Sequence, residues 1–286
     1  MSVHGVKPVF LQKKSAILLA HSNEKGGVGK TTVSFNQAYR LAEKGKRVLV
    51  VDIDGQRNMS KLLLGSFENV VWVENNGFTS PSLFEPNLSP EKITVYPSVV
   101  HENIFVIPAH KERIANVLSA GREAAQLVLN PRKYLVNLDF DFILIDTPPS
   151  LGLTQVAAIA AVDWLFIPVT VDDFSNEGML SLLKTVSIVK KNTRSSVEIA
   201  GIYINLFKTP TKRTGENPYA DILETLEKTY SKFLIKPYLP DSISIREARM
   251  KGKACWVTPP NGNAAVIGRT FRTGIDELNS RLGVAK

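Results

Sequence analysis

Residues 23–32 read Asn-Glu-Lys-Gly-Gly-Val-Gly-Lys-Thr-Thr, directly after a short apolar run and at the start of a helix-like stretch. A loop that holds phosphate needs glycines, whose neighbouring backbone N–H groups can curl around phosphate oxygens. It also needs a lysine for the β- and γ-phosphates and a hydroxyl for Mg²⁺. The segment supplies all three, and the following helix adds the positive end of its dipole. The sequence therefore predicts a binding site for a nucleoside triphosphate rather than a plain glycine turn.

Within this loop we assign Lys30 to the phosphate charge and the Thr31 hydroxyl to Mg²⁺. The other residues expected to bind the nucleotide are Gly26, Gly27, Val28, Gly29 and Thr32, with Thr32 next to the α-phosphate. The segment departs from the general GxxxxGK[ST] pattern at Glu24, where that pattern has glycine. A second lysine, Lys25, immediately precedes the double glycine.

The rest of the chain alternates short apolar runs with helix-like stretches, which is typical of an α/β fold with a doubly wound, mostly parallel sheet flanked by helices. We expect buried strands at 16–20, 48–53, 104–107, 142–145, 165–169 and 199–204, with a weaker one at 233–239. We expect helices at 31–44, 177–191 and 218–230.

Length and composition favour one domain over residues 1–286, with 1–14 as an N-terminal extension. Residues 66–102 have no clean period and predict an irregular surface insertion with one short helix near 81–84. No run approaches 18 uncharged apolar residues, so no membrane span is expected. The single cysteine, Cys255, excludes an internal disulfide or a four-cysteine cluster within one chain.

Two further motifs place carboxylates where two predicted strands end. Asp52 and Asp54 follow the strand at 48–53, and Asp146 follows the strand at 142–145 as a Walker B acid that would hold Mg²⁺. Doubly wound sheets bind their ligands at the carboxyl ends of parallel strands, so we expect these acids to lie beside the phosphate loop.

The stretches at 25–32, 52–58 and 146–152 together resemble the ParA/MinD family of deviant Walker A ATPases. The resemblance implies that Lys25 reaches the phosphates of a partner subunit, that Lys30 is the ordinary phosphate lysine, and that Asp54 positions the attacking water. It places Asp52 nearer the Mg²⁺ shell. Gly55 stands where the family usually has proline, and Arg57 where it has glycine.

The same resemblance suggests where the base binds. Asn205 ends the predicted strand at 199–204, and the family reads adenine near that position; Pro240 and Asp241 fall where relatives line the other side of the base. An asparagine at a strand end is otherwise an ordinary turn residue.

Charge points to a polyanionic partner without choosing one. The net charge is +8, and residues 246–286 carry eight basic and three acidic residues, a net charge of +5. The alternative that involves no partner is a solvated basic face. Our candidates for nonspecific contacts with duplex DNA are Arg246, Arg249, Lys251, Arg269 and Arg272.

The family resemblance implies a short ParA-type ATPase that partitions a plasmid or chromosome, uses ATP and Mg²⁺, and forms an ATP-dependent homodimer. Its expected partners are DNA and a ParB-like centromere-binding protein, and its expected location is cytoplasmic and nucleoid-associated. Two alternatives stay open: an ATPase that positions a protein cargo on the nucleoid, and a MinD-like membrane-associated ATPase. The second depends on an apolar helical stripe (Ile267, Phe271, Ile275, Leu278, Leu282), which more often packs on a core.

Overall fold

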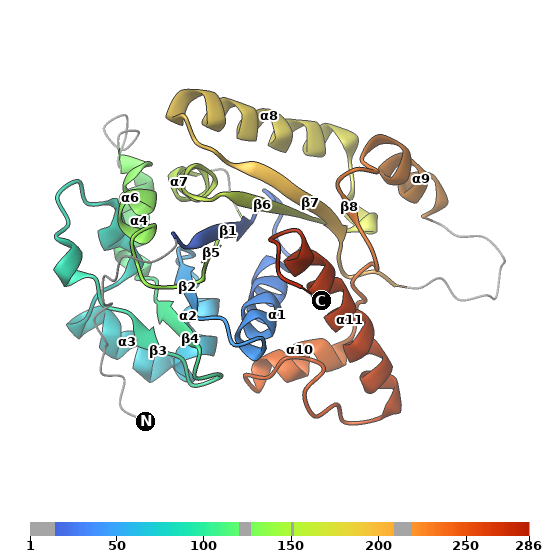
Figure 1. The fold of residues 1–286 in the computed structure, drawn as a ribbon, viewed down its shortest axis with the longest axis horizontal. Helices are drawn as coiled ribbons and strands as arrows, with labels where there is room; N and C mark the ends of the chain where they lie inside the picture. Colours follow the sequence, from blue (N-terminus) through green and yellow to red (C-terminus); the bar gives the residue numbers. More distant parts are fainter. Residues whose placement is uncertain (1–14, 120–126, 150–151, 209–218, 286) are drawn as a thin grey trace.

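Eight strands form one sheet in the order β3-β4-β2-β5-β1-β6-β7-β8 in the computed structural model, which describes residues 15–119, 127–149, 152–208 and 219–285 (Figure 1). The paired strands run parallel except β3, which lies antiparallel to β4 at one edge. The strands are β1 (Ile17–His21), β2 (Val48–Asp52), β3 (Tyr96–Pro97), β4 (Ile104–Ile107), β5 (Phe142–Asp146), β6 (Trp164–Val169), β7 (Glu198–Ile204) and β8 (Leu234–Ile235). The predicted α/β class and mostly parallel sheet are confirmed.

Strand register brings the predicted motifs together at the carboxyl ends of three central strands. The last residues of three neighbouring strands are aligned: His21 of β1 pairs with Asp146 of β5, and Asp146 pairs with Asp52 of β2. The connection from β1 to β2 runs across the sheet in one direction, whereas the connection from β5 to β6 runs in the other. The loop after β1 therefore lies at the switch point where doubly wound folds bind ligands.

Helices cover both faces of the sheet (Figure 1). One apolar cluster packs residues of α7, α8 and the 80–84 turn against one face, and another packs α1, α2, α3 and α11 against the opposite face. The helices are α1 (Lys30–Glu43), α2 (Asn58–Leu64), α3 (Phe67–Asn76), α4 (Lys111–Ser119), α6 (Asn130–Leu135), α7 (Leu153–Ala161), α8 (Asn176–Thr193), α9 (Ala220–Thr229), α10 (Ile243–Met250) and α11 (Gly262–Ser280). Short 3-10 helices are η1 (Ser80–Phe84), η2 (Pro90–Lys92) and η3 (Val171–Asp173).

The apolar stripe near the C-terminus packs on the core. Phe271, Ile275, Leu278 and Leu282 are buried in the cluster that also contains α1 residues, and Ile267 packs against it. This confirms the core interpretation of the stripe over the lipid-facing one. In the described ranges no helix has the length and apolar character needed to cross a bilayer.

The segment 66–102 is more regular than its sequence suggested. Ser66 caps α3 by accepting a hydrogen bond from the Asn69 backbone N–H, and Val70 and Val73 of that helix are buried. The short helix expected near 81–84 is present as η1. Helix α3 was missed because only two of its apolar positions are buried, and strand β3 because two residues are too few to show a period. The predicted extension at 1–14 lies outside the described residues.

Candidate active site

The phosphate loop follows β1 and takes backbone conformations that favour glycine. Gly27 and Gly29 have φ of 80° and 85°, in the left-handed region. A Cβ at Gly29 would also lie 2.2 Å from Nδ2 of Asn205, whereas one at Gly27 would meet nothing within 4 Å. Gly29 is therefore favoured both by its backbone conformation and by the close approach of the Asn205 side chain.

The loop wraps around the side chain of Lys30, the first residue of α1. Its Nζ donates to the backbone carbonyls of Asn23 at 2.8 Å and Lys25 at 3.1 Å, and the side chain is buried. Burial lowers the pKa of Lys30, while the carboxylates of Asp146 and Asp54 oppose that shift. The ammonium is thus held at the centre of the loop, where an incoming phosphate would meet it.

Thr31 and Asp146 form the part of the site best suited to a cation. The Thr31 hydroxyl donates to Oδ2 of Asp146 at 2.9 Å, while Oδ1 of Asp146 is buried and has no hydrogen-bond partner. Burial, and next the carboxylate of Asp52, raise the pKa of Asp146. A buried carboxylate oxygen without a partner, beside a hydroxyl, fits a hard cation such as Mg²⁺, which prefers oxygen ligands and usually shares them with substrate phosphates.

A metal site built from protein side chains alone would need several ligand residues close together. Within the described ranges, no group of three or more His, Cys, Asp or Glu residues could hold a metal ion. The site thus fits a metal that takes part of its coordination from a bound phosphate and from water.

Asp52 accepts hydrogen bonds that stabilise the connection after β2. Its Oδ2 accepts hydrogen bonds from the backbone N–H of Ser60 at 2.8 Å and from the Ser60 hydroxyl at 2.6 Å, and its Oδ1 accepts one from the Asp54 backbone at 3.0 Å. Burial raises the pKa of this carboxyl. These bonds tie the end of β2 to α2, and the metal-binding role of Asp52 stays a prediction.

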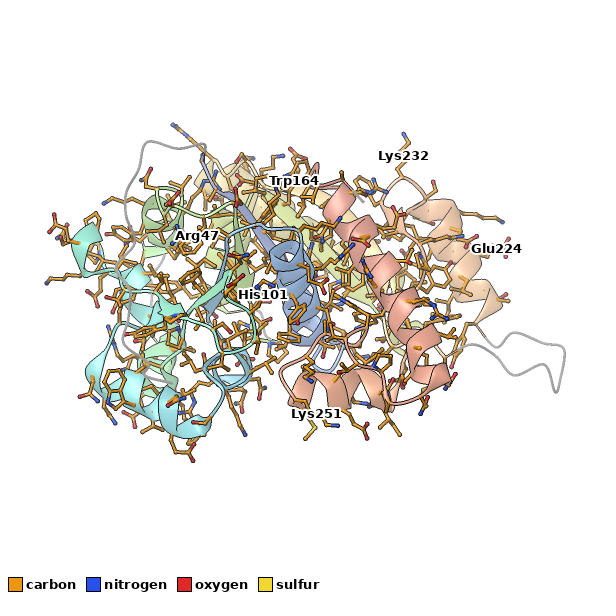
Figure 2. All side chains as sticks on the ribbon, turned by 60° about the horizontal axis from the view of Figure 1, so that its bottom comes forward. Arg47, His101, Trp164, Glu224, Lys232 and Lys251 are labelled. Carbon is orange, nitrogen blue, oxygen red and sulfur yellow. The ribbon has the colours of Figure 1, made fainter. Side chains whose placement is uncertain are left out.

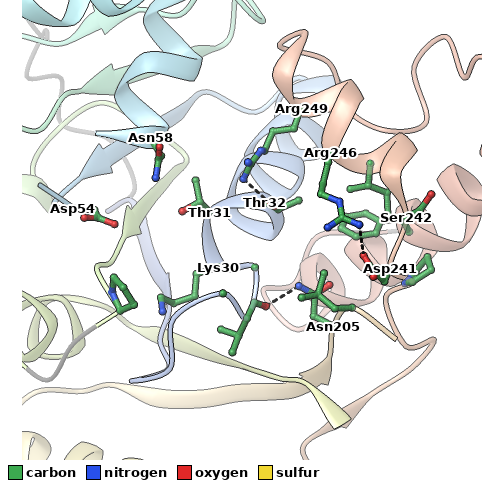
Figure 3. A pocket seen from close by; sticks show the side chains of 18 of the residues that line it. Lys30, Thr31, Thr32, Asp54, Asn58, Asn205, Asp241, Ser242, Arg246 and Arg249 are labelled. Carbon is green, nitrogen blue, oxygen red and sulfur yellow. Dashed lines mark hydrogen bonds and ion pairs between the residues drawn. The ribbon is translucent and has the colours of Figure 1, made fainter. Parts of the chain in front are cut away.

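Asp54 lies at the cavity wall, in the turn between β2 and α2. Its Oδ1 accepts a hydrogen bond from the Gln56 backbone at 2.9 Å, which fixes the carboxylate within the turn. The half-buried side chain stands across the cavity from the phosphate loop (Figure 3). This position is compatible with the predicted role of placing water.

On the opposite side of the cavity lie the predicted base contacts. Asn205 is buried and donates through Nδ2 to the Val28 carbonyl at 2.8 Å, so it fastens the phosphate loop to the end of β7. Pro240 pairs with Phe207 in a parallel bridge, and Asp241 forms an ion pair with Arg246 at 3.2 Å. All three predicted residues line the same cavity as the loop.

The cavity has a volume of about 350 Å³. Gly27, Val28, Gly29, Lys30, Thr31, Thr32 and Asp54 line it, with Asn205, Pro240 and Asp241 from the other side. Lys25 is exposed on the loop, and its backbone N–H donates to the Asn23 side chain at 2.9 Å. The cavity is also lined by Gln56, Asn58 and Ser242, which were not predicted as site residues. The polar run at 54–58 was the available signal for the first two.

The five predicted DNA contacts fall into two groups. Arg246 and Arg249 line the nucleotide cavity (Figure 3). Lys251 follows α10 and is exposed at the edge of the molecule (Figure 2), while Arg269 and Arg272 are exposed on α11. The DNA contacts of all five residues stay a prediction.

Comparisons with known proteins agree with this geometry. The AAA domain family AAA_31 matches residues 16–199. The sporulation initiation inhibitor protein Soj of Bacillus subtilis strain 168 is 31% identical over 254 residues, which cover 87% of this chain and 94% of Soj. The chromosome-partitioning ATPase Soj of Treponema pallidum strain Nichols is 32% identical over 235 residues, which cover 82% of this chain and 87% of that protein. Among solved structures, an ATP complex of Cyanothece McdA superposes with a TM-score of 0.78 at 21% identity, covering 95% of this chain and 98% of McdA.

Proposed function

This chain belongs to the ParA/Soj family of P-loop ATPases, and from that premise we propose that it is a Mg²⁺-dependent partition ATPase that hydrolyses ATP to ADP and phosphate in a single domain. The observation that carries the proposal is the buried Lys30 ammonium beside the Thr31–Asp146 pair, whose free carboxylate oxygen suits a cation. The cargo that we favour is a plasmid or a chromosome.

Each residue has a distinct task in this proposal. Lys30 neutralises phosphate charge, and the loop amides and the α1 dipole add to the attraction. Thr31 and Asp146 hold Mg²⁺, which when bound neutralises charge on the phosphates. Asp54 orients the water that attacks, and the cavity wall formed by Asn205, Pro240 and Asp241 faces the adenine.

Lys25 acts in trans in this account. The Lys25 side chain is exposed on the loop, so it can reach a second copy of the chain that docks over the cavity. ATP would then sit between two subunits, and dimerisation would depend on the triphosphate.

Nonspecific DNA is the proposed track for the ATP-bound dimer. Lys251, Arg269 and Arg272 are exposed cations, and the C-terminal segment is strongly basic. Contacts of this kind bind phosphate without reading sequence and weaken with salt. A ParB-like protein on the cargo would stimulate hydrolysis, and the protein would be cytoplasmic and nucleoid-associated.

The two alternative functions differ from partition in their cargo or in the cellular surface to which the ATPase would bind. An ATPase that positions a protein cargo would use the same site and the same DNA, so the partner alone separates it from partition. A MinD-like membrane ATPase loses its sequence basis, because the apolar stripe of α11 is buried.

Retention on duplex DNA tests this proposal against the membrane alternative. With ATP and Mg²⁺ we expect an Asp54→Ala protein to bind random-sequence DNA, and ADP to abolish binding. Charge reversal of Arg269 and Arg272 together should reduce DNA binding while sparing ATP binding. Flotation with anionic liposomes and no DNA retention would favour the MinD-like function. Capture of a centromere-binding protein by the ATP-locked protein would separate partition from positioning of a protein cargo.

A further inference from the structure

Arg249 reaches the phosphate loop from a helix far away in the sequence. It lies near the end of α10, and its Nη1 donates to the Thr32 hydroxyl at 2.8 Å (Figure 3). Thr32 is the third residue of α1 and belongs to the loop that is built for phosphate. Arg249 therefore joins the far wall of the cavity to the helix that begins at the phosphate loop.

The charge of Arg249 is not matched by a carboxylate. Among the residues that the structure describes, Arg249 has no ion pair, and the partner of its guanidinium is the neutral hydroxyl of Thr32. Arg246, one turn earlier on α10, differs in this respect, because Asp241 lies 3.2 Å from it. A half-buried guanidinium beside a phosphate loop, with five N–H donors and one neutral acceptor, is suited to an additional anion.

We propose that Arg249 is a phosphate-binding residue of the nucleotide site and not a DNA contact. This inference rests on the proposed ATPase function, and it adds a cation that the loop motif does not contain. Thr32 is the loop residue expected next to the α-phosphate, so the Arg249 guanidinium would serve the phosphate that ATP and ADP share. Lys30, by contrast, serves the β- and γ-phosphates.

The nature of that phosphate makes the inference specific. Loss of a charge-assisted hydrogen bond costs a factor of about 10 to 100 in affinity. Arg249→Gln should therefore weaken ADP and ATP by similar factors. Arg249→Lys should recover part of the loss, because it keeps the charge but not the fork of donors.

The experiment is calorimetric titration of ADP, ATP and adenosine into the full chain and into variants with unchanged unfolding temperature. Arg249→Gln should lose both phosphorylated ligands and leave adenosine unchanged, and its deficit should shrink at high salt because the contact is electrostatic. Lys253→Gln is the matched control: it removes one exposed positive charge three residues past the end of α10 and outside the cavity lining, and it should bind like the parent. If Arg249→Gln proves unstable, the comparison of Arg249→Lys with the parent carries the same test.

Parental affinity of Arg249→Gln for ADP would overturn the inference. So would an equal loss in Lys253→Gln, since the effect would then come from the general field of the basic segment. Loss of DNA retention with unchanged ADP binding would restore Arg249 as a DNA contact. Lys30→Ala separates this inference from the function: nucleotide binding that survives in Lys30→Ala contradicts the ATPase proposal itself, whereas its loss there with retention in Arg249→Gln contradicts only the role of Arg249.

Discussion

The guanidinium of Arg57 lies 3.0 Å from the carboxylate of Glu74, and this pair connects the Asp54 turn to α3. Arg57 has a φ of 59°, a left-handed conformation that favours glycine, which is the usual residue in the family at this position. Phe67 lies under the same guanidinium at 4.8 Å, and Glu74 also accepts a hydrogen bond from the Lys111 backbone at 3.0 Å. The side-chain contacts hold an arginine in a conformation that its backbone disfavours.

Glu74→Gln tests whether this pair steadies the turn that carries Asp54. Both partners are largely buried, at 14% and 11% exposure, so we expect a loss of about 1–3 kcal/mol in the free energy of unfolding. Turnover should fall by several-fold with ATP affinity nearly unchanged, because the change disturbs the placement of Asp54 and not the phosphate loop. Urea unfolding and steady-state hydrolysis measure the two effects.

Two variants control this prediction. Glu224→Gln removes the acid of an exposed ion pair on α9 and should cost less than about 0.5 kcal/mol. Arg57→Gly relieves the backbone while losing the pair, so it should be less destabilising than Glu74→Gln. A Glu74→Gln protein with parental stability and turnover would show that the pair does not steady the turn.

Gly29→Ala and Gly27→Ala separate backbone preference from close packing. Both glycines have positive φ, so an alanine at either position costs about 1–2 kcal/mol. At Gly29 the new Cβ would also collide with Nδ2 of Asn205, 2.2 Å away, so this side chain would have to move and give up its hydrogen bond to the Val28 carbonyl. We expect Gly29→Ala to lose ATP binding and Gly27→Ala to keep a measurable part of it, as followed by nucleotide titration. Equal losses in the two variants would remove the packing argument.

The lowered pKa of His21 predicts how the free energy of unfolding depends on pH. Burial lowers its pKa to about 4, and its ring nitrogens contact the Tyr203 hydroxyl at 2.8 Å and Oε1 of Gln37 at 2.7 Å. The unfolded chain, with a histidine pKa of about 6.5, binds the proton first as the pH falls. The contribution of neutral His21 is therefore complete above pH 6.5 and is lost as the pH falls toward 4.

The measurement compares the parent with His21→Gln by urea unfolding at pH 7 and pH 4.5. The parent should lose roughly 2–3 kcal/mol more than the variant between these two pH values. The variant is expected to be less stable at pH 7 as well, because a buried hydrogen-bond network is disturbed. Parallel stability curves would mean that His21 does not titrate differently in the folded and unfolded states.

Lys25→Gln should leave nucleotide binding by the monomer largely intact and weaken ATP-dependent dimerisation. The reason is the exposed position of Lys25 on the loop, together with the trans role that the family resemblance implies. Light scattering with ATP and Mg²⁺ on an Asp54→Ala background measures the dimer. An unchanged dimer would make Lys25 an ordinary loop residue.

The sequence predicted the central parallel strands well because each is a short, nearly continuous apolar run, whereas the weaker run at 233–239 contains only the two-residue edge strand β8. The run at 104–107 coincides with β4, and the run at 142–145 falls one residue short of β5. Helix α3 escaped prediction because its buried positions, Val70 and Val73, share the helix with Phe67 and Trp72, which are exposed at 44% and 43%. Such a mixture of buried and exposed apolar residues hides the helical period.

The candidate site was predictable where motifs are contiguous and not where the fold brings distant segments together. The loop at 25–32, Asp54 and Asp146 were predicted from local patterns. Residues 27–32 and Asp54 line one cavity, and Asp146 accepts a hydrogen bond from Thr31. The bond from Arg249 to Thr32 joins residues 217 positions apart, and nothing in the local sequence of α10 distinguishes it from a solvated basic helix. Charge alone suggested a DNA contact for Arg249, which stays a prediction, and did not suggest that this residue lines the nucleotide cavity.

Parallel measurement of ATP affinity and turnover in Lys30→Ala and Asp54→Ala tests the central claim most directly. Lys30 holds phosphate charge, so Lys30→Ala should lose ATP binding, whereas Asp54 places water, so Asp54→Ala should keep ATP within a few-fold and lose at least about 100-fold in turnover. Calorimetry and phosphate release give the two quantities on the same preparations. Equal losses of ATP affinity in both variants, or full turnover in Asp54→Ala, would contradict the account.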